Sequence, residues 1–232
     1  MVIFGLEKLS LVDYDGKIAA TVFTGGCNFR CPFCHNSALV LDYKALPHIS
    51  DAEIFSYLEK RRGVLEGVCV TGGEPTLNPD LPEFIAKIKN IGYSVKLDTN
   101  GTNPEMVKSL FSAGLIDHFA VDIKNDKDDY AEIIGLKSFD TKNVEKTVEF
   151  LMTSGASYEF RTTIIAEFHS ADNIRKIGEW INGANNYFMQ KFKSGDNCIR
   201  GGLSPVPTEK AKDFLEIISP FVKNAALRGY DI

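Results

Sequence analysis

The sequence predicts an α/β protein in which parallel strands alternate with helices that pack on the outside of the sheet. Short apolar and β-branched runs alternate with longer amphipathic runs along most of the 232 residues, an order typical of parallel sheets with crossover helices. Polar residues collect where the predicted strands end, which is the edge where such sheets bind ligands.

Six strands and six helices are expected in alternation. The strands are residues 18–23, 68–71, 93–97, 118–123, 158–164 and 186–192. The helices are residues 51–61, 81–90, 104–112, 143–153, 172–182 and 208–221. Ser50 and Glu53 have capping-box spacing at the first helix, and Pro82 stands near the start of the second, where a missing N–H costs little. The pattern alone fits an open, partial (βα)6 barrel or a doubly wound sheet.

Length and composition predict an ordinary globular protein. Hydrophobic residues make up 44% and charged residues 25% of the chain, so we expect a single domain over residues 1–232, with a core of about 15–195 and a C-terminal helical extension of about 205–232. The net charge of −5 disfavours nucleic-acid binding. No apolar run of about 18 residues indicates a membrane span, and no signal-peptide layout is present. We therefore expect a cytoplasmic protein that binds neither membranes nor nucleic acid.

Three of the five cysteines, Cys27, Cys31 and Cys34, lie within eight positions as C-x3-C-x2-C. In a cytosolic chain this spacing favours metal ligation over disulfides. Iron–sulfur clusters are usually held by four thiolates, so three ligands leave one iron open to another molecule. An open coordination site is typical of catalytic metal centres.

A structural zinc site is the alternative, with a fourth ligand from His35, Cys69 or Cys198. Structural zinc sites usually have paired C-x2-C spacings, and the chain has no second pair. His35 adjoins Cys34, which makes it awkward as a ligand of the same ion. Cys69 lies in an apolar run, where a buried core cysteine is the default, and Cys198 is assigned no role.

The cysteine motif resembles the C-x3-C-x-aromatic-C signature of the radical SAM superfamily, with Phe33 as the aromatic residue. The resemblance implies the partial (βα)6 barrel of that superfamily and a [4Fe–4S] cluster on Cys27, Cys31 and Cys34. It further implies that the open iron binds S-adenosylmethionine, with Phe33 beside the adenine. Reductive cleavage of this cofactor gives methionine and a 5′-deoxyadenosyl radical.

Gly72, Gly73 and Glu74 follow the second predicted strand and match the GGE element of the same superfamily. The resemblance implies that this segment holds the methionyl ammonium group of the cofactor. A carboxylate with backbone carbonyls is suited to a buried cation. The alternative is an ordinary strand-to-helix turn with a solvated glutamate.

Further polar side chains are expected at the same edge of the sheet. The candidates at the ends of the next three strands are Asp98, Thr99, Asp122, Lys124, Arg161 and Thr163. In related activating enzymes, matching positions contact the cofactor or a bound monovalent cation. Ion pairs or polar residues at the border of the core are the alternative for each of them. Lys193 is a weaker candidate, and His48, His118 and His169 are taken as ordinary structural residues.

Longer matches narrow the resemblance to the glycyl radical enzyme activating family. Residues 5–14, 16–23, 26–36, 71–76, 96–101, 121–124 and 158–163 are most similar to anaerobic ribonucleoside-triphosphate reductase activating proteins. The resemblance ends near Phe192, and Asp15 stands where a proline is expected. It implies hydrogen abstraction from a glycine of a glycyl radical enzyme, with flavodoxin or ferredoxin as the reductant.

Three other functions stay open. The chain could activate pyruvate formate-lyase or another glycyl radical enzyme. It could be a radical SAM enzyme acting on a small molecule or another peptide. It could also be an iron–sulfur electron carrier or metal-stabilised binding module, although the GGE element and the aspartates at the strand ends would then have no purpose.

Overall fold

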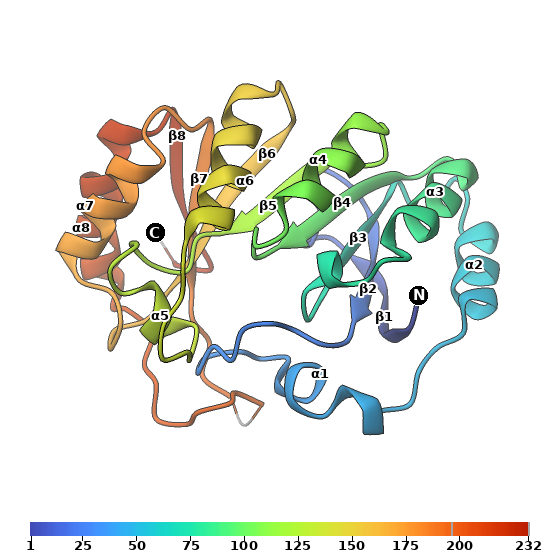
Figure 1. Cartoon of the computed structure of the whole chain (residues 1–232), viewed down its shortest axis with the longest axis horizontal. Coiled ribbons are helices and arrows are strands. Elements are labelled where there is room, and N and C mark those ends of the chain that lie inside the picture. The colour runs from blue at the N-terminus through green and yellow to red at the C-terminus, as the bar shows by residue number, and fades with distance from the viewer. Residues whose placement is uncertain (196, 232) are drawn as a thin grey trace.

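The computed structural model describes residues 1–195 and 197–231 and contains one eight-stranded sheet (Figure 1). The strands lie side by side in chain order from β1 to β8. They are β1 (Ile3–Ser10), β2 (Ala19–Thr24), β3 (Gly67–Gly72), β4 (Ser94–Thr99), β5 (His118–Asp122), β6 (Tyr158–Ile164), β7 (Asn186–Lys191) and β8 (Asn224–Arg228). Strand β1 runs antiparallel to β2, and every pair from β2 to β8 is parallel.

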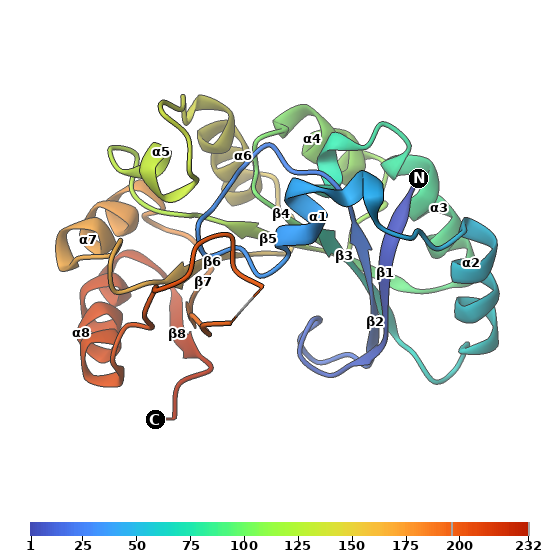
Figure 2. The ribbon, with the colours of Figure 1, turned by 90° about the horizontal axis from the view of Figure 1, so that it is seen from below.

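The α-helices are α1 (Ser37–Leu41), α2 (Asp51–Lys60), α3 (Leu81–Ile91), α4 (Pro104–Ser112), α5 (Tyr130–Ile133), α6 (Lys142–Thr153), α7 (Ala171–Trp180) and α8 (Thr208–Ile218). Helices α3, α4, α6, α7 and α8 lie on the outer, convex side of the curved sheet, as Figure 2 shows. Short 3-10 helices are η1 (Tyr43–Ala45), η2 (Pro75–Leu77) and η3 (Ser219–Phe221). Each strand from β2 to β7 is thus followed by helix, which gives six βα units.

The expected α/β architecture is confirmed, and the strand order selects the partial barrel. A doubly wound sheet reverses its strand order at a switch point, whereas here the order follows the chain throughout. The six predicted strands correspond to β2 through β7. The sheet curves but stays open, with β1 and β8 at its two edges (Figure 2).

Two strands were missed by sequence reasoning. Strand β1 alternates poorly because Glu7 to Leu9, in its second half, face solvent at the sheet edge. Strand β8 is five residues long and only Leu227 is buried in it. The predicted C-terminal extension is therefore only partly helical. It contains helix α8 (Thr208–Ile218), after which the chain returns to the sheet as β8 beside β7. Ile232, within the predicted extension, lies outside the described residues.

Helix α3 illustrates how the outer layer is fixed. Leu81, Phe84, Ile85 and Ile88 repeat at helical spacing and are buried, so this face packs inward while the charged face stays in water. At α2 the capping box of Ser50 and Glu53 is present as predicted. No helix in the described part of the chain combines the length and apolar character that a membrane crossing requires.

Candidate active site

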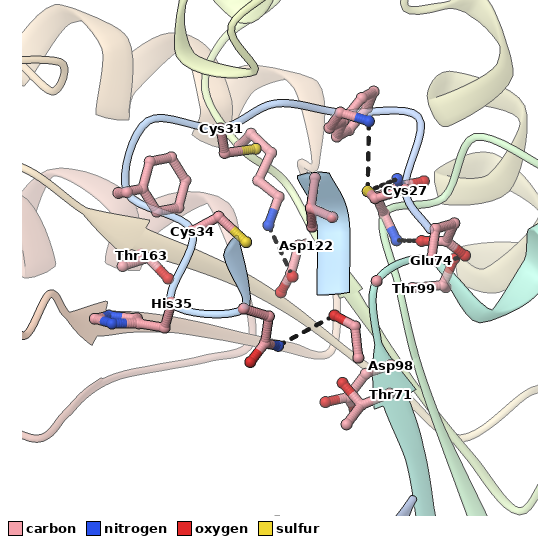
Figure 3. Close-up of a pocket in the computed structure, with 18 residues that line it drawn as sticks. Cys27, Cys31, Cys34, His35, Thr71, Glu74, Asp98, Thr99, Asp122 and Thr163 are labelled. Carbon is pink, nitrogen blue, oxygen red and sulfur yellow. Dashed lines mark hydrogen bonds and ion pairs between the residues drawn. The ribbon is translucent and has the colours of Figure 1, made fainter. Parts of the chain in front are cut away.

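The three cysteines lie on the loop between β2 and α1 and line one pocket (Figure 3). The pocket stands at the carboxyl ends of the parallel strands, where the sequence predicted a site. Two backbone hydrogen bonds hold this loop: Gly26 N–H donates to Leu39 O at 2.8 Å, and Arg30 N–H donates to Ile134 O at 2.8 Å. The loop is therefore attached both to α1 and to the end of α5.

Burial is the largest influence on the cysteine thiols. It raises the pKa of Cys27 to about 11 and of Cys31 to about 12, and it raises the pKa of Cys34 as well. The nearby Lys124 ammonium opposes the shift in all three cases. Without a metal these thiols stay protonated at neutral pH, and a bound metal would displace their protons.

Three thiols from one loop, lining one pocket, fit the donor set of an iron–sulfur cluster. Across residues 1–195 and 197–231, no three histidine, cysteine or acidic side chains gather closely enough to hold a single metal ion. The thiolates of a four-iron cluster bind different irons, so they stand further apart than the ligands of one ion.

Gly72 and Gly73 allow the end of β3 to approach the cysteine loop closely. A Cβ atom on Gly73 would stand 2.0 Å from Gly26 O, and Gly72 has a φ of +114°. The contact is fixed by hydrogen bonds of 2.8 Å from Gly73 N–H to Thr24 O and from Glu74 N–H to Gly26 O. Larger residues would separate these two segments.

Glu74 lies in the pocket wall, but its carboxylate is engaged by its own chain. Oε1 accepts hydrogen bonds from the N–H and hydroxyl of Thr76 and from the Thr99 hydroxyl, and Oε2 accepts one from Asn100 N–H at 2.7 Å. Burial raises the pKa of Glu74, and these hydrogen bonds act in the opposite direction. In this arrangement Glu74 joins the GGE turn to the end of β4; its predicted contact with an ammonium group stays a prediction.

Asp98, Thr99, Asp122, Lys124 and Thr163 also line the pocket, as expected. Lys124 Nζ lies 2.9 Å from Asp122 Oδ2 and 5.7 Å from the centre of the Phe33 ring. Phe33 lines the same pocket. The Lys124 ammonium thus lies over the aromatic ring of Phe33, which belongs to the cysteine loop.

Arg161 does not line this pocket. Its guanidinium forms ion pairs with two carboxylates of the pocket wall, at 3.2 Å from Asp98 Oδ2 and 3.0 Å from Asp122 Oδ1. Burial alone would raise the pKa of Asp122, but Arg161 and Lys124 outweigh it and hold that pKa below its usual range. Arg161 is thus placed to orient two carboxylates of the pocket rather than to line it.

Sequence reasoning missed several pocket residues, namely Phe29, His35, Asn36, Val40, Thr71 and Asn100. Asn36 follows the cysteines directly, and its side chain donates to Gly72 O at 3.1 Å. Asn100 belongs to a Thr-Asn-Gly run that reads as a simple turn. Lys193, by contrast, is not among the residues that line the pocket.

The remaining cysteines differ in position. Cys69 is buried in β3, as expected for a core residue. Cys198 comes from the loop between β7 and α8, and its sulfur lies 3.8 Å from Phe33 O and 3.7 Å from His35 Nδ1. That loop also donates from Arg200 N–H to Pro32 O at 2.8 Å, so it packs against the cysteine loop.

Comparison with known proteins agrees with this site. The profile of the Radical SAM superfamily matches residues 21–173, about two thirds of the chain, and the chain therefore belongs to that superfamily. Membership implies a [4Fe–4S] cluster and S-adenosylmethionine.

The chain is 30% identical over 230 residues to MJ1227 of Methanocaldococcus jannaschii, whose name presents it as a candidate glycyl-radical enzyme activating enzyme. The match covers 97% of this chain and 94% of that protein. Within the superfamily, the chain belongs to the family of this relative.

Solved structures support the fold. A domain of pyruvate-formate lyase-activating enzyme from Bacteroides vulgatus has a TM-score of 0.57 at 17% identity, covering 70% of this chain and 99% of that domain. Streptococcus suis SuiB bound to its precursor peptide SuiA has a TM-score of 0.67 at 16% identity, covering 90% of this chain and 48% of SuiB. At these identities the likeness concerns the fold alone.

Proposed function

We propose that this protein is a radical SAM activase that makes a glycyl radical on anaerobic ribonucleoside-triphosphate reductase. One observation carries the proposal: the three-cysteine loop, the GGE turn and the strand-end carboxylates meet in one pocket at the carboxyl edge of the sheet. The name of the full-length relative MJ1227 supports a glycyl radical enzyme as the partner. The choice of the reductase rests on the sequence motifs.

The residues of the pocket divide into those that would hold the cluster and those that would hold S-adenosylmethionine. Cys27, Cys31 and Cys34 would bind three irons of a [4Fe–4S] cluster. The cofactor would contact Phe33 through its adenine and Gly72, Gly73 and Glu74 through its methionyl ammonium. The cofactor or a monovalent cation would contact Asp98, Thr99, Asp122, Lys124 and Thr163. Of these, Lys124 supplies a positive charge for a carboxylate, while Asp98 and Asp122 supply negative charge.

Arg161 would act through Asp98 and Asp122 by holding both carboxylates in place. The Oδ1 atom of Asp98 is buried without a hydrogen-bond partner, although Lys96 Nζ lies 3.4 Å away. A monovalent cation stays in the proposal on the resemblance alone, because the Lys96 ammonium already forms an ion pair with this oxygen.

The cluster and cofactor together would supply one-electron chemistry: with an electron from a flavodoxin or ferredoxin, S-adenosylmethionine would be cleaved to methionine and a 5′-deoxyadenosyl radical able to take a hydrogen atom from glycine. The chain's contribution is to position the cofactor between the cysteine loop and the strand ends. It also limits water, since Cys31, Phe33 and Glu74 are all buried. We place the reaction in the cytoplasm.

Cysteine replacement tests the ligand assignment. Anaerobically reconstituted protein with dithionite and S-adenosylmethionine is expected to release 5′-deoxyadenosine, and Cys31→Ala is expected to abolish the release because a cluster ligand is lost. Cys69→Ala is the matched control, because Cys69 is buried in β3 and does not line the pocket, so the variant should leave turnover in place. Sustained turnover by Cys31→Ala would refute the ligand set.

The partner is tested by electron paramagnetic resonance after incubation with candidate glycyl radical enzymes. A glycyl doublet is expected on anaerobic ribonucleoside-triphosphate reductase. A doublet on pyruvate formate-lyase alone would replace the named partner and keep the chemistry. Release of 5′-deoxyadenosine without a doublet on any glycyl radical enzyme would point instead to a small-molecule or other peptide substrate.

A further inference from the structure

Three polar side chains form a closed hydrogen-bonded ring beside Cys27: Asn28, Asn100 and Thr102. Asn28 Nδ2 donates to Thr102 Oγ1 at 2.9 Å, and the Thr102 hydroxyl donates to Asn100 Oδ1 at 2.7 Å. Asn100 Nδ2 completes the ring by donating to Asn28 Oδ1 at 2.8 Å. The ring joins the cysteine loop to the segment that follows β4.

The orientation of the Asn100 amide is fixed by a group that can only donate. The backbone N–H of Thr102 donates to Asn100 Oδ1 at 3.1 Å, so the carbonyl side of the amide must face Thr102. Its NH2 group then faces Asn28 Oδ1 and the Cys27 sulfur, which lies 3.9 Å from Nδ2. An amide flipped about its axis would place two donors against each other.

Asn100 is also held through its main chain and kept from water. Its backbone N–H donates to the buried Glu74 carboxylate at 2.7 Å, and the residue is 6% exposed. Among the described residues, the Phe29 N–H is the other N–H near the Cys27 sulfur, at 3.4 Å. A donor that is fixed and poorly solvated interacts more strongly with a nearby charge than one in water.

We propose that Asn100 is a positioning residue that directs an N–H toward the Cys27 sulfur and thereby raises the reduction potential of the [4Fe–4S] cluster. This inference rests on the proposed function, since it requires a cluster on Cys27. Reduction adds one electron, and part of the added negative charge lies on the ligating sulfurs. Hydrogen bonds to these sulfurs stabilise the reduced state and are a known influence on cluster potentials.

The test is a redox titration of the reconstituted protein in the absence of S-adenosylmethionine. Electron paramagnetic resonance measures the reduced cluster at each potential. Asn100→Leu removes the donor without adding charge, and Asn100→Asp removes it and adds a negative charge. Both variants are expected to shift the midpoint potential to more negative values, with the larger shift for Asn100→Asp. Iron and sulfide contents are measured on every sample, so that only protein with a complete cluster is compared.

Asn103→Asp is the matched control. It adds the same charge three residues further along, where the side chain caps α4 by accepting from Met106 N–H and donates to Thr76 O rather than facing a cysteine. Its potential is expected to stay at the wild-type value. An equal shift in this control would show a general charge effect and overturn the inference.

The remaining outcomes are also decisive. Wild-type potentials in both Asn100 variants, with intact clusters, would overturn the inference while leaving the proposed function untouched. If only one variant takes up a cluster, its potential decides the question. Loss of the cluster in both variants, with the control intact, would assign Asn100 to holding the loop instead. A wild-type chain that assembles no four-iron cluster would refute the proposed function itself.

Discussion

His169 shows how a single buried side chain links two loops below the pocket. Its Nδ1 accepts from Ile165 N–H at 3.0 Å, and its Nε2 lies 3.0 Å from Lys124 O. The Ile165 N–H favours a neutral ring with its hydrogen on Nε2, although Ile165 O lies 3.3 Å from Nδ1 and is an acceptor for a second ring hydrogen. Burial lowers the pKa of His169 to about 4, which keeps the ring neutral at pH 7 in the folded chain.

The pH dependence of stability follows from this pKa. In the unfolded chain this histidine is protonated below its ordinary pKa of about 6.5. In the folded chain it is protonated only below a pH of about 4. The free energy of unfolding should therefore fall by about 2 kcal/mol between pH 7 and pH 5 on account of this residue alone.

Urea titrations at the two pH values, on the wild type and on His169→Gln, measure this contribution. The variant is expected to be less stable at pH 7 but to lose less on acidification, since it lacks the titrating group. The same pH-dependent loss in both proteins would contradict the assignment. Control titrations use His48→Gln, which replaces an exposed histidine.

At the scale of elements, the contact between the end of β3 and the cysteine loop depends on glycine. The Cβ of Gly73→Ala would meet Gly26 O, a backbone atom that cannot move aside as a side-chain end can. We expect the variant to lose about 1–3 kcal/mol of stability from overpacking and to take up less iron, because the cysteine loop must shift.

The measurements are urea unfolding and the iron content after anaerobic reconstitution. Gly201→Ala is the control, because its new methyl group would meet no atom within 4 Å. Full iron uptake by Gly73→Ala would show that the two segments can separate without harm to the site.

At the scale of the whole molecule, Arg228 joins the two ends of the open sheet. From β8 it donates to both carboxylate oxygens of Glu159, at 3.0 and 2.8 Å, and to Asp15 Oδ2 at 2.6 Å in the connection between β1 and β2. Glu159 belongs to β6 and is buried. One guanidinium thus connects β6, β8 and the first hairpin below the candidate site.

Arg228→Met is expected to lower the free energy of unfolding by about 1–3 kcal/mol, because the buried Glu159 loses two charge-assisted hydrogen bonds. Asp15→Asn, at an exposed partner, is expected to change it by no more than about 0.5 kcal/mol. Chemical denaturation compares the two variants. An equal loss in both would place the stabilisation in the exposed pair rather than in the contact with Glu159.

The order of six βα units, the cysteine loop and the position of the strand-end residues could all be predicted from the sequence. These features depend on local spacing: apolar periodicity, capping residues and the closeness of Cys27, Cys31 and Cys34 along the chain. The glycine pair Gly72–Gly73 was likewise identified by its place after a strand.

The long-range partners of each polar residue became visible only in the folded chain. The fold placed Arg161 beneath the pocket, engaged Glu74 with the end of β4, and brought Asn100 to Cys27 across more than seventy positions of sequence. It also returned the chain after α8 to the sheet as β8. Such partners are set by strand register and sheet curvature, which depend on packing between distant segments and leave no periodic signal along the chain.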